Sequence, residues 1–334
     1  MKTAVISVTK QGDAIAERIK QNIEVDIFSK FKTKGFDINS ISKTCMESYN
    51  SIIYIASTGI AVRSIAPFLK SKYIDPAVIV IDCTGKYVIS LLSGHLGGAN
   101  KLAIKLSKNL RAEAIITTAS DNLGFTAPDM VAKEFGLEIE DLKKAKAIAA
   151  LMVEGKKIGF IDEDEDTDCP TGYEASSLED INKYEGLVYI TNKADLSFSN
   201  TAILKLIRKN IILGIGCRKN YDNEKMLKQV EEVLHKYNID KRAIKCITTV
   251  EVKREERAII SLSQTLKCPL EIWGIKEIKE IQHKYLGSDF VEKTIGIRAV
   301  SEPCVELSKG ELLFPKLSIE GMTLCIGKYK ELNI

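Results

Sequence analysis

The sequence predicts an α/β protein with a doubly wound, mostly parallel sheet in the N-terminal domain, a variable middle region, and a second α/β domain at the C-terminus. Three observations support this prediction. Short runs rich in Val, Ile and Leu alternate with helical patterns along most of the chain. The N-terminal runs are almost continuously apolar, as in strands that helices cover on both faces. The 334 residues, 45% of them hydrophobic, suffice for more than one core.

The N-terminal domain is predicted to span residues 1–136. Its expected helices include Ile60–Leu69 and Ala99–Asn109. Because strands and helices alternate, the strands are expected to run mostly parallel. The expected strands are Thr3–Val8, Ile23–Phe28, Ile52–Ser57, Val78–Asp82, Tyr87–Leu92 and Ala114–Thr118.

The alternation weakens over residues 137–209, which we interpret as a middle region or linker. It contains the acidic tract Asp162–Asp168, which lacks the spacing of an EF-hand loop and is interpreted as a solvated loop. A C-terminal α/β domain is predicted over residues 210–334. Its expected elements are the strands Ile211–Ile215, Ala243–Thr249 and Leu270–Trp273 and the helices Asp222–Tyr237 and Arg254–Leu266.

Composition excludes several classes of protein. The net charge of +3 is close to balance and the lysines are dispersed, which argues against a nucleic-acid partner. No apolar run approaches the roughly 20 residues that cross a bilayer, and the first residues mix acidic and basic side chains, so we expect neither membrane association nor a signal peptide. The 8 cysteines form no C-x-x-C pair. A reducing, cytoplasmic location is therefore expected.

Ligands of open parallel sheets bind beyond the carboxyl ends of the strands, so the turns after the strands are the first places to search. Thr58 and Gly59 form one such turn, and the helix that follows would present free N–H groups to an anion. A strand–helix turn without any ligand explains the same residues equally well.

The second turn is the glycine-rich segment Ser93–Asn100. Gly94, Gly97 and Gly98 bring the backbone close to another group, and His95 is one of only 3 histidines in the chain. Imidazole exchanges protons near neutral pH, so His95 is a candidate acid or base, although a lone histidine is often structural. The spacing fits neither the dinucleotide fingerprint nor the P-loop, so NAD and ATP have no support.

Polar residues also follow later strands. Asp121 is interpreted as a helix cap, or as a group that polarises water or holds a histidine. Arg218, beside Gly216, suits a carboxylate. Cys217 is interpreted as a structural thiol rather than a nucleophile. Glu302 is either an acid at the crevice or a carboxylate at the positive end of a helix.

Four of these segments together resemble the cobalt-precorrin-5A hydrolase family, CbiG. They occur in the family's order, they span most of the chain, and the run S-G-H-L-G-G-A-N is the most specific of them. The segments are Ser57–Arg63, Leu91–Asn100, Gly214–Arg218 and Val300–Pro303.

The resemblance implies a reaction and a substrate. The substrate is a cobalt-bound tetrapyrrole with peripheral carboxylates and a δ-lactone on ring A, in the anaerobic cobalamin pathway. Water opens the lactone, and the two-carbon unit derived from C20 leaves as acetaldehyde to give cobalt-precorrin-5B. This classes the chain as a hydrolase acting on carbon–carbon bonds. The cobalt is carried by the substrate, so no cofactor and no protein metal site are expected.

Under this resemblance His95 is the expected general base or acid, and Glu302 is a second candidate for proton transfer. Backbone N–H groups of Gly97 and Gly98, or of Thr58, are expected to stabilise the oxyanion. The binding crevice is expected between the terminal domains. The residues expected to contact the substrate are Thr58, Gly59, Arg63, Ser93, Gly94, Gly97, Gly98, Asn100, Asp121, Gly216 and Arg218.

Two alternatives stay open at the level of sequence. A non-catalytic corrinoid carrier would use the same glycine turns and arginines without needing a proton carrier. His95 would alternatively ligate the substrate's cobalt axially instead of moving protons. The expected partner is the small corrinoid molecule, and a homodimer and transient contacts with neighbouring enzymes of the corrinoid pathway are compatible with the sequence.

Overall fold

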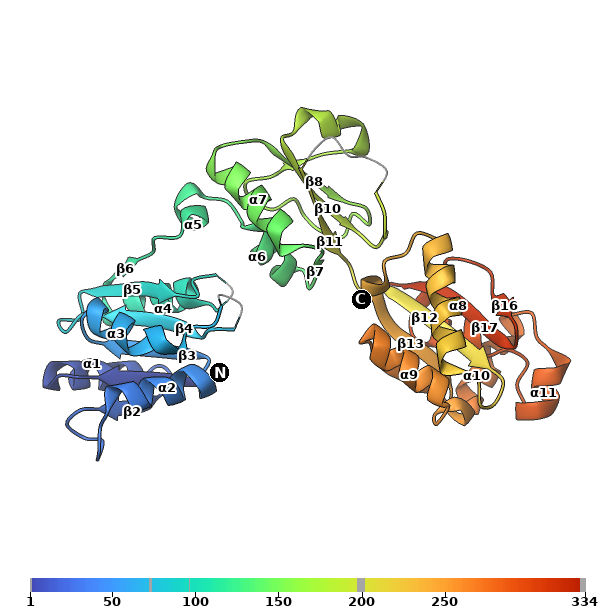
Figure 1. Cartoon of the computed structure of the whole chain (residues 1–334), viewed down its shortest axis with the longest axis horizontal. Helices are drawn as coiled ribbons and strands as arrows, with labels where there is room; N and C mark the ends of the chain where they lie inside the picture. The colour runs from blue at the N-terminus through green and yellow to red at the C-terminus, as the bar shows by residue number, and fades with distance from the viewer. Residues whose placement is uncertain (1, 72–73, 96, 197–201, 331–334) are drawn as a thin grey trace. The chain divides into compact units, whose positions relative to one another are not determined.

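The computed structural model describes residues 2–71, 74–95, 97–196 and 202–330. The chain divides into two compact units (Figure 1). Unit 1 comprises Met1–Lys133 with Pro170–Gly172, and unit 2 comprises Glu134–Cys169 with Tyr173–Ile334. Unit 2 thus contains most of the middle region together with the C-terminal domain, while the boundaries drawn from the sequence stay predictions. No helix among the described residues combines the length and apolar character needed to cross a membrane.

Unit 1 contains a six-stranded sheet in the order β2-β1-β3-β4-β5-β6, and every strand predicted from the sequence is present. Its mostly parallel pairing confirms the predicted fold class. The strands are β1 (Thr3–Ser7), β2 (Asp26–Ser29), β3 (Ser51–Ile55), β4 (Ala77–Ile81), β5 (Tyr87–Leu92) and β6 (Glu113–Ile115).

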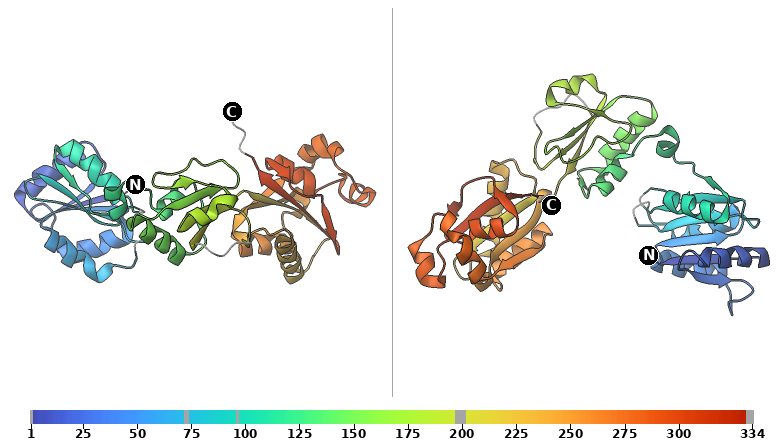
Figure 2. Two further views of the ribbon diagram at one scale, coloured as in Figure 1. Left: turned by 90° about the horizontal axis from the view of Figure 1, so that it is seen from above. Right: turned by 180° about the vertical axis from the view of Figure 1, so that it is seen from behind.

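Helices cover both faces of this sheet, as Figure 2 shows, so the doubly wound arrangement is confirmed. Successive strand residues point to opposite faces: Val5 packs with α1 and α4, whereas Ala4 packs with α2 and α3. Both residues are fully buried, which explains the continuous apolar runs. The covering helices are α1 (Lys10–Lys20), α2 (Ile38–Ser48), α3 (Thr58–Ile65) and α4 (Ala99–Leu110), and α5 (Ala119–Leu123) and α6 (Pro128–Glu134) follow β6.

One pairing in unit 1 differs from the parallel pattern. β4 and β5 are antiparallel, joined by a tight connection, and β6 is parallel to β5. The turns after β5 and β6 therefore lie at the edge where β1, β3 and β4 begin, opposite the turn after β3. The turns after the strands of this unit therefore lie at two opposite edges of the sheet.

The first part of unit 2 is a five-stranded sheet in the order β7-β11-β10-β8-β9, in which only β7 is antiparallel to its neighbour. Helix α7 (Leu142–Val153) packs on β10 and β11, and the N-cap Asp141 accepts from the N–H of Lys143. The strands are β7 (Glu138–Ile139), β8 (Ile158–Asp162), β9 (Glu174–Ala175), β10 (Gly186–Thr191) and β11 (Ala202–Ile207).

The second part of unit 2 is a sheet in the order β14-β13-β12-β17-β15, with β16 paired to β17. β12, β13 and β14 are parallel, and β17 is antiparallel to β12. The strands are β12 (Ile211–Cys217), β13 (Ile244–Val250), β14 (Leu270–Trp273), β15 (Gly310–Leu312), β16 (Leu317–Ile319) and β17 (Met322–Tyr329). The helices are α8 (Asn223–Lys236), α9 (Arg257–Leu266), α10 (Ile275–Ile281), α11 (Asp289–Ile295) and α12 (Ser301–Leu307). Its 3₁₀ turns are η3 (Lys241–Ala243), η4 (Glu251–Lys253) and η5 (Gln282–Lys284), whereas η1 (Ala66–Phe68) lies in unit 1 and η2 (Leu178–Lys183) in the first part of unit 2.

Helices again cover both faces of this sheet. α8 and α9 pack on one face, and α12 crosses the other. Gly214 permits that crossing, because a Cβ there would lie 2.1 Å from the carbonyl oxygen of Ser301. The segments Gly214–Arg218 and Val300–Pro303, separate in sequence, are therefore neighbours in space.

The acidic tract of the middle region is held in place by cations. Arg208 forms an ion pair with Asp162 and lies 3.6 Å from Asp164. Asp164 also accepts a hydrogen bond from the amide of Asn210 and forms an ion pair with Lys328. The interpretation as a solvated loop is therefore wrong for Asp162 and Asp164. These contacts fasten the middle sheet to the C-terminal sheet.

A buried lysine makes a second connection inside unit 2. Lys205 on β11 is 2% exposed, and its ammonium donates to the carbonyls of Lys193 and Ala194 at 3.0 and 2.7 Å. It also pairs with Asp240 at 3.1 Å. Because a buried charge without partners is costly, these contacts favour one defined arrangement of the two sheets.

Candidate active site

The glycine-rich loop after β5 folds back on the start of β4. Ser93 has a left-handed φ of 57°, and its hydroxyl donates to the carbonyl of Asp75 at 2.9 Å. The N–H groups of Ala99 and Asn100 donate to the carbonyls of Ser93 and Gly94. These bonds close the loop and start α4 directly behind it.

The loop glycines are required by the loop itself. A Cβ at Gly94 would lie 2.8 Å from Oδ1 of Asn100, and a Cβ at Gly97 would lie 2.4 Å from Cβ of Ser93. Gly98, the N-cap of α4, has a φ of 86°. The group that the backbone approaches closely is therefore the protein, and the glycine spacing alone does not indicate a ligand.

His95 is held by residues that follow β6. Its Nε2 atom lies 2.8 Å from Oγ of Ser120 and 3.3 Å from Oδ2 of Asp121. The His95 side chain is 21% exposed, so the imidazole is partly open to solvent. The parallel pairing of β5 and β6 allows this contact, because it places the ends of both strands at the same edge of the sheet.

Both contacts of the ring are made by one nitrogen. In the Ser-His-Asp sites of hydrolases, hydroxyl and carboxylate contact opposite nitrogens, so this cluster is a different arrangement. The tautomer with its proton on Nε2 is compatible with both contacts, because the ionised carboxylate of Asp121 only accepts hydrogen bonds and the Ser120 hydroxyl accepts as well as donates. In that tautomer Nδ1 has the lone pair, and no described residue forms a hydrogen bond with it.

Asn100 connects the parts of this cluster. Its amide nitrogen donates to Oδ2 of Asp121 at 2.7 Å and to Oγ1 of Thr118 at 3.0 Å. Its amide oxygen accepts from the hydroxyl of Ser90 at 2.6 Å. The residue is 5% exposed, so it acts as a buried support for Asp121. Asp121 makes side-chain contacts with both Asn100 and His95, whereas the N-cap of α5 is Thr118.

Three members of the cluster were not singled out from the sequence: Ser90, Thr118 and Ser120. Ser120 is 6% exposed and completes the His95 environment. The only sequence signal was the run of polar residues after β6, which cannot show which side chains face the glycine loop.

The predicted residues of the turn after β3 lie elsewhere in unit 1. Thr58 and Gly59 begin α3 at the carboxyl edge of β3, opposite the edge that carries His95. Arg63 is exposed, and its guanidinium contacts the carbonyl of Gly59 at 3.5 Å. These residues do not join the His95 cluster.

The predicted residues of unit 2 share the carboxyl edge of β12. Gly216 packs against Thr323 and Val300, and Arg218 is exposed and lies over Gly321. No ion pair joins Arg218 to another residue in the described ranges, so its guanidinium is available to an anion.

Glu302 and Cys217 lie in environments that restrict their reactivity. Glu302, at the start of α12, is 8% exposed and pairs with Lys316 at 2.8 Å. Burial raises the pKa of Cys217 to about 11, so its thiolate is scarce at neutral pH. Both observations agree with structural roles.

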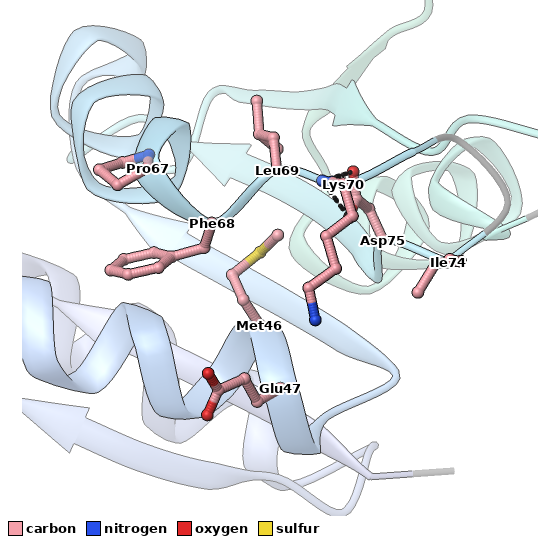
Figure 3. Close-up of a pocket in the computed structure, with 8 residues that line it drawn as sticks. All are labelled: Met46, Glu47, Pro67, Phe68, Leu69, Lys70, Ile74 and Asp75. Carbon is pink, nitrogen blue, oxygen red and sulfur yellow. Dashed lines mark hydrogen bonds between the residues drawn. The ribbon is translucent and has the colours of Figure 1, made fainter.

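A small cavity adjoins the His95 loop through Asp75, whose carbonyl accepts from Ser93. Its volume is about 190 Å³, and its lining comes from α2, η1 and the segment that leads to β4 (Figure 3). The carboxylate of Asp75 accepts from the N–H of Lys70 inside it. The cavity is smaller than the several hundred cubic ångströms of ordinary ligand pockets. In the described ranges, no cluster of three or more His, Cys, Asp or Glu is placed to hold a metal ion.

Fold and site together define a class: a doubly wound α/β protein with an oriented imidazole in a closed glycine loop. Three family models match the chain in order. They are described as Cobalamin synthesis G N-terminal (residues 40–121), Cobalamin biosynthesis central region (residues 126–206) and Cobalamin synthesis G C-terminus (residues 211–327).

Relatives match over nearly the full length. The chain is 31% identical over 339 residues to the cobalt-precorrin-5A hydrolase of Salmonella typhimurium, covering 97% of each protein. It is 31% identical to the protein of the same name from Priestia megaterium, covering 92% of this chain and 89% of the relative. It is 29% identical to a probable cobalt-precorrin-5A hydrolase of Methanocaldococcus jannaschii, covering 99% and 96%. The chain belongs to the cobalamin synthesis G family, CbiG.

Proposed function

We propose that this protein is a cobalt-precorrin-5A hydrolase that opens the ring A δ-lactone and releases the two-carbon unit as acetaldehyde. Full-length relatives with that name support the assignment of substrate. The observation on which the chemistry depends is the orientation of His95, whose Nε2 atom is engaged by Ser120 and Asp121. The reaction is hydrolytic and ends in cleavage of a carbon–carbon bond.

His95 acts in this proposal as the proton carrier through Nδ1. In the first step Nδ1 takes a proton from the attacking water while the water oxygen bonds to the lactone carbonyl carbon. The single bond between the carbonyl carbon and the ring oxygen of the lactone then breaks, and the protonated imidazole of His95 gives its proton to the leaving alkoxide. In the second step a base removes the proton of the new hydroxyl. The carbon–carbon bond breaks, acetaldehyde leaves, and the corrin ring accepts the electron pair.

The oxyanion of the first step needs a hydrogen-bond donor near His95. The N–H of Gly98 donates to the carbonyl of His95 at 3.0 Å and is already used. Thr58 lies at the opposite edge of the sheet. The N–H of Gly97 has no acceptor among the described residues, so we assign it this role.

The remaining predicted residues divide by their surroundings. Asn100 and Asp121 orient His95, and Ser93 and Gly94 shape the loop. Arg63 and Arg218, with the turns Thr58–Gly59 and Gly216, are proposed contacts for peripheral carboxylates of the substrate. Glu302 is paired and buried, so proton transfer is assigned to His95. Cobalt arrives with the substrate, and no protein cofactor is proposed.

The test is to mix the purified full-length protein with cobalt-precorrin-5A and to measure free acetaldehyde against time. The proposal expects acetaldehyde and cobalt-precorrin-5B in equal amounts over many turnovers. A corrinoid carrier would bind the substrate and release no acetaldehyde. Binding without release would therefore refute the hydrolase assignment.

A further inference from the structure

Unit 2 contains a groove that none of the residues discussed above lines. It lies beside the C-terminal end of α12, whereas Glu302 begins that helix. Its volume is about 460 Å³, within the range of small-molecule sites. We call it the Trp273 groove, and its lining residues are Lys245, Glu271, Ile272, Trp273, Leu307, Ser308, Lys309 and Tyr329.

One wall of the groove is fixed by a chain of hydrogen bonds. The indole N–H of Trp273 donates to Oγ of Ser308 at 3.0 Å, and the Ser308 hydroxyl donates to Oγ1 of Thr248 at 3.0 Å. Ser308 is 7% exposed and Thr248 is fully buried. The partly exposed indole therefore has one orientation before any ligand arrives, which lowers the entropic cost of stacking on it.

The opposite wall combines an aromatic ring with cations. The ammonium of Lys245 lies 3.9 Å from the ring centroid of Tyr329. Lys309 is exposed at the same end of α12. Within the described part of the chain, neither lysine forms an ion pair. Glu271 is the single acidic residue of the lining, and it makes a hydrogen bond with the thiol of Cys246. The groove thus offers the indole of Trp273 as a stacking surface, together with a net positive charge.

We propose that the Trp273 groove binds one edge of a flat, conjugated ring system that carries carboxylates. The ring would stack on Trp273, and its carboxylates would pair with Lys245 and Lys309. A corrinoid has this chemistry, and the choice of a corrinoid rests on the proposed function. The site itself is additional to the His95 cluster, because its residues belong to unit 2.

The sequence provides a specific reporter for this site, because Trp273 is the only tryptophan. Protein labelled with 5-fluorotryptophan gives one ¹⁹F resonance, which reports on the groove. Cobyrinic acid, with free carboxylates, is the probe, and its heptamethyl ester is the control with the same ring and no charge. Calorimetry on the same samples gives the dissociation constants.

We expect the free acid to shift the ¹⁹F resonance with the dissociation constant that calorimetry measures, and the ester to bind much more weakly. Replacing both groove lysines (Lys245→Met, Lys309→Met) should weaken binding of the acid by about tenfold, as for two partly exposed ion pairs. The matched pair Lys228→Met and Lys241→Met, exposed on the far side of the sheet, should leave it unchanged.

Three results would overturn the proposal: no binding of the acid, binding that leaves the resonance unmoved, or equal binding of acid and ester. His95→Ala protein should show the same shift as the wild type. A shift with cobyrinic acid, combined with no acetaldehyde release from cobalt-precorrin-5A in the separate assay, would refute the hydrolase assignment and leave the groove supported, so the two failures are distinguishable.

Discussion

Oδ2 of Asp121 lies 3.3 Å from Nε2 of His95 and accepts a hydrogen bond of 2.7 Å from the amide of Asn100. The amide of Asn100 therefore fixes the Asp121 carboxylate, and that carboxylate in turn favours the tautomer of His95 with its proton on Nε2. This relationship makes Asp121 a positioning residue, because it acts through His95 and not on the substrate.

The Asp121→Asn variant should show whether the carboxylate of this side chain, rather than its shape, orients the imidazole of His95. An asparagine keeps the size of the side chain but presents an amide, so it no longer requires the proton on Nε2. We expect kcat for acetaldehyde release to fall at least tenfold, toward the factor of about 100 that general acid–base groups contribute. Glu113→Gln, exposed on β6, is the control and should match the wild type. An unchanged kcat in the Asp121 variant would refute the positioning role.

Asn100→Ala should weaken unit 1 as well as the site. Three polar partners lose their hydrogen bonds in a nearly buried environment. We expect the free energy of unfolding to fall by about 2–4 kcal/mol, measured by urea denaturation. Asn39→Ala, at an exposed position of α2, should cost less than about 0.5 kcal/mol. Equal losses in the two variants would contradict the network.

The buried pair of unit 2 predicts a pH dependence. Burial alone would raise the pKa of Asp240, but hydrogen bonds from Arg242 and Lys205 outweigh it and lower the pKa from 3.8 to about 2. Because the pKa of Asp240 is lower in the folded protein than in the unfolded chain, its carboxylate stabilises the fold at pH values above the unfolded-state pKa. That stability should disappear as the pH falls from about 4 to about 2, by roughly 2 kcal/mol.

Asp240→Asn removes the titrating group, so its free energy of unfolding should lack this acid-dependent component. Denaturant melts of both proteins between pH 5 and pH 2 test the point. The difference between wild type and variant should shrink toward low pH. A constant difference over this interval would contradict the assignment to Asp240.

Gly214→Ala should destabilise unit 2 strongly. The new methyl group would meet the carbonyl oxygen of Ser301 at 2.1 Å and push α12 away from β12. We expect a loss of about 3 kcal/mol in thermal or urea unfolding. Gly274→Ala is the control, because its Cβ would meet only side-chain carboxylates, Oε2 of Glu277 at 3.1 Å and the Glu251 oxygens at 4.0 Å, and no backbone atom. Comparable stability of the two variants would disprove the close approach of α12.

The strands and the α/β class were predictable, because near-continuous apolar runs arise from burial on both faces. The antiparallel direction of β5 was not predicted, since a run such as Tyr87–Leu92 has the same pattern in either direction. A usable signal existed: only Cys83–Lys86 separate the predicted strands, too few residues for a parallel crossover.

The candidate site was predictable in part. His95 and Asp121 follow strands and carry suitable chemistry, so sequence reasoning found both. Their contact, and the participation of Ser120, depend on the parallel pairing of β5 with β6, which puts the two following turns side by side and which local patterns do not encode. The close backbone approach at Gly94 and Gly97 was interpreted as room for a ligand, because the sequence does not show that Asn100 and Ser93 fill the adjacent space.

The most direct test of the account compares wild type with His95→Ala for acetaldehyde release from cobalt-precorrin-5A, with the substrate dissociation constant measured in parallel. His235→Ala, exposed on α8, is the matched control. We predict that the His95 variant binds substrate normally, releases acetaldehyde at least about 100-fold more slowly, and is partly rescued by added imidazole. Wild-type turnover by the His95 variant would contradict the central claim that this imidazole carries the proton.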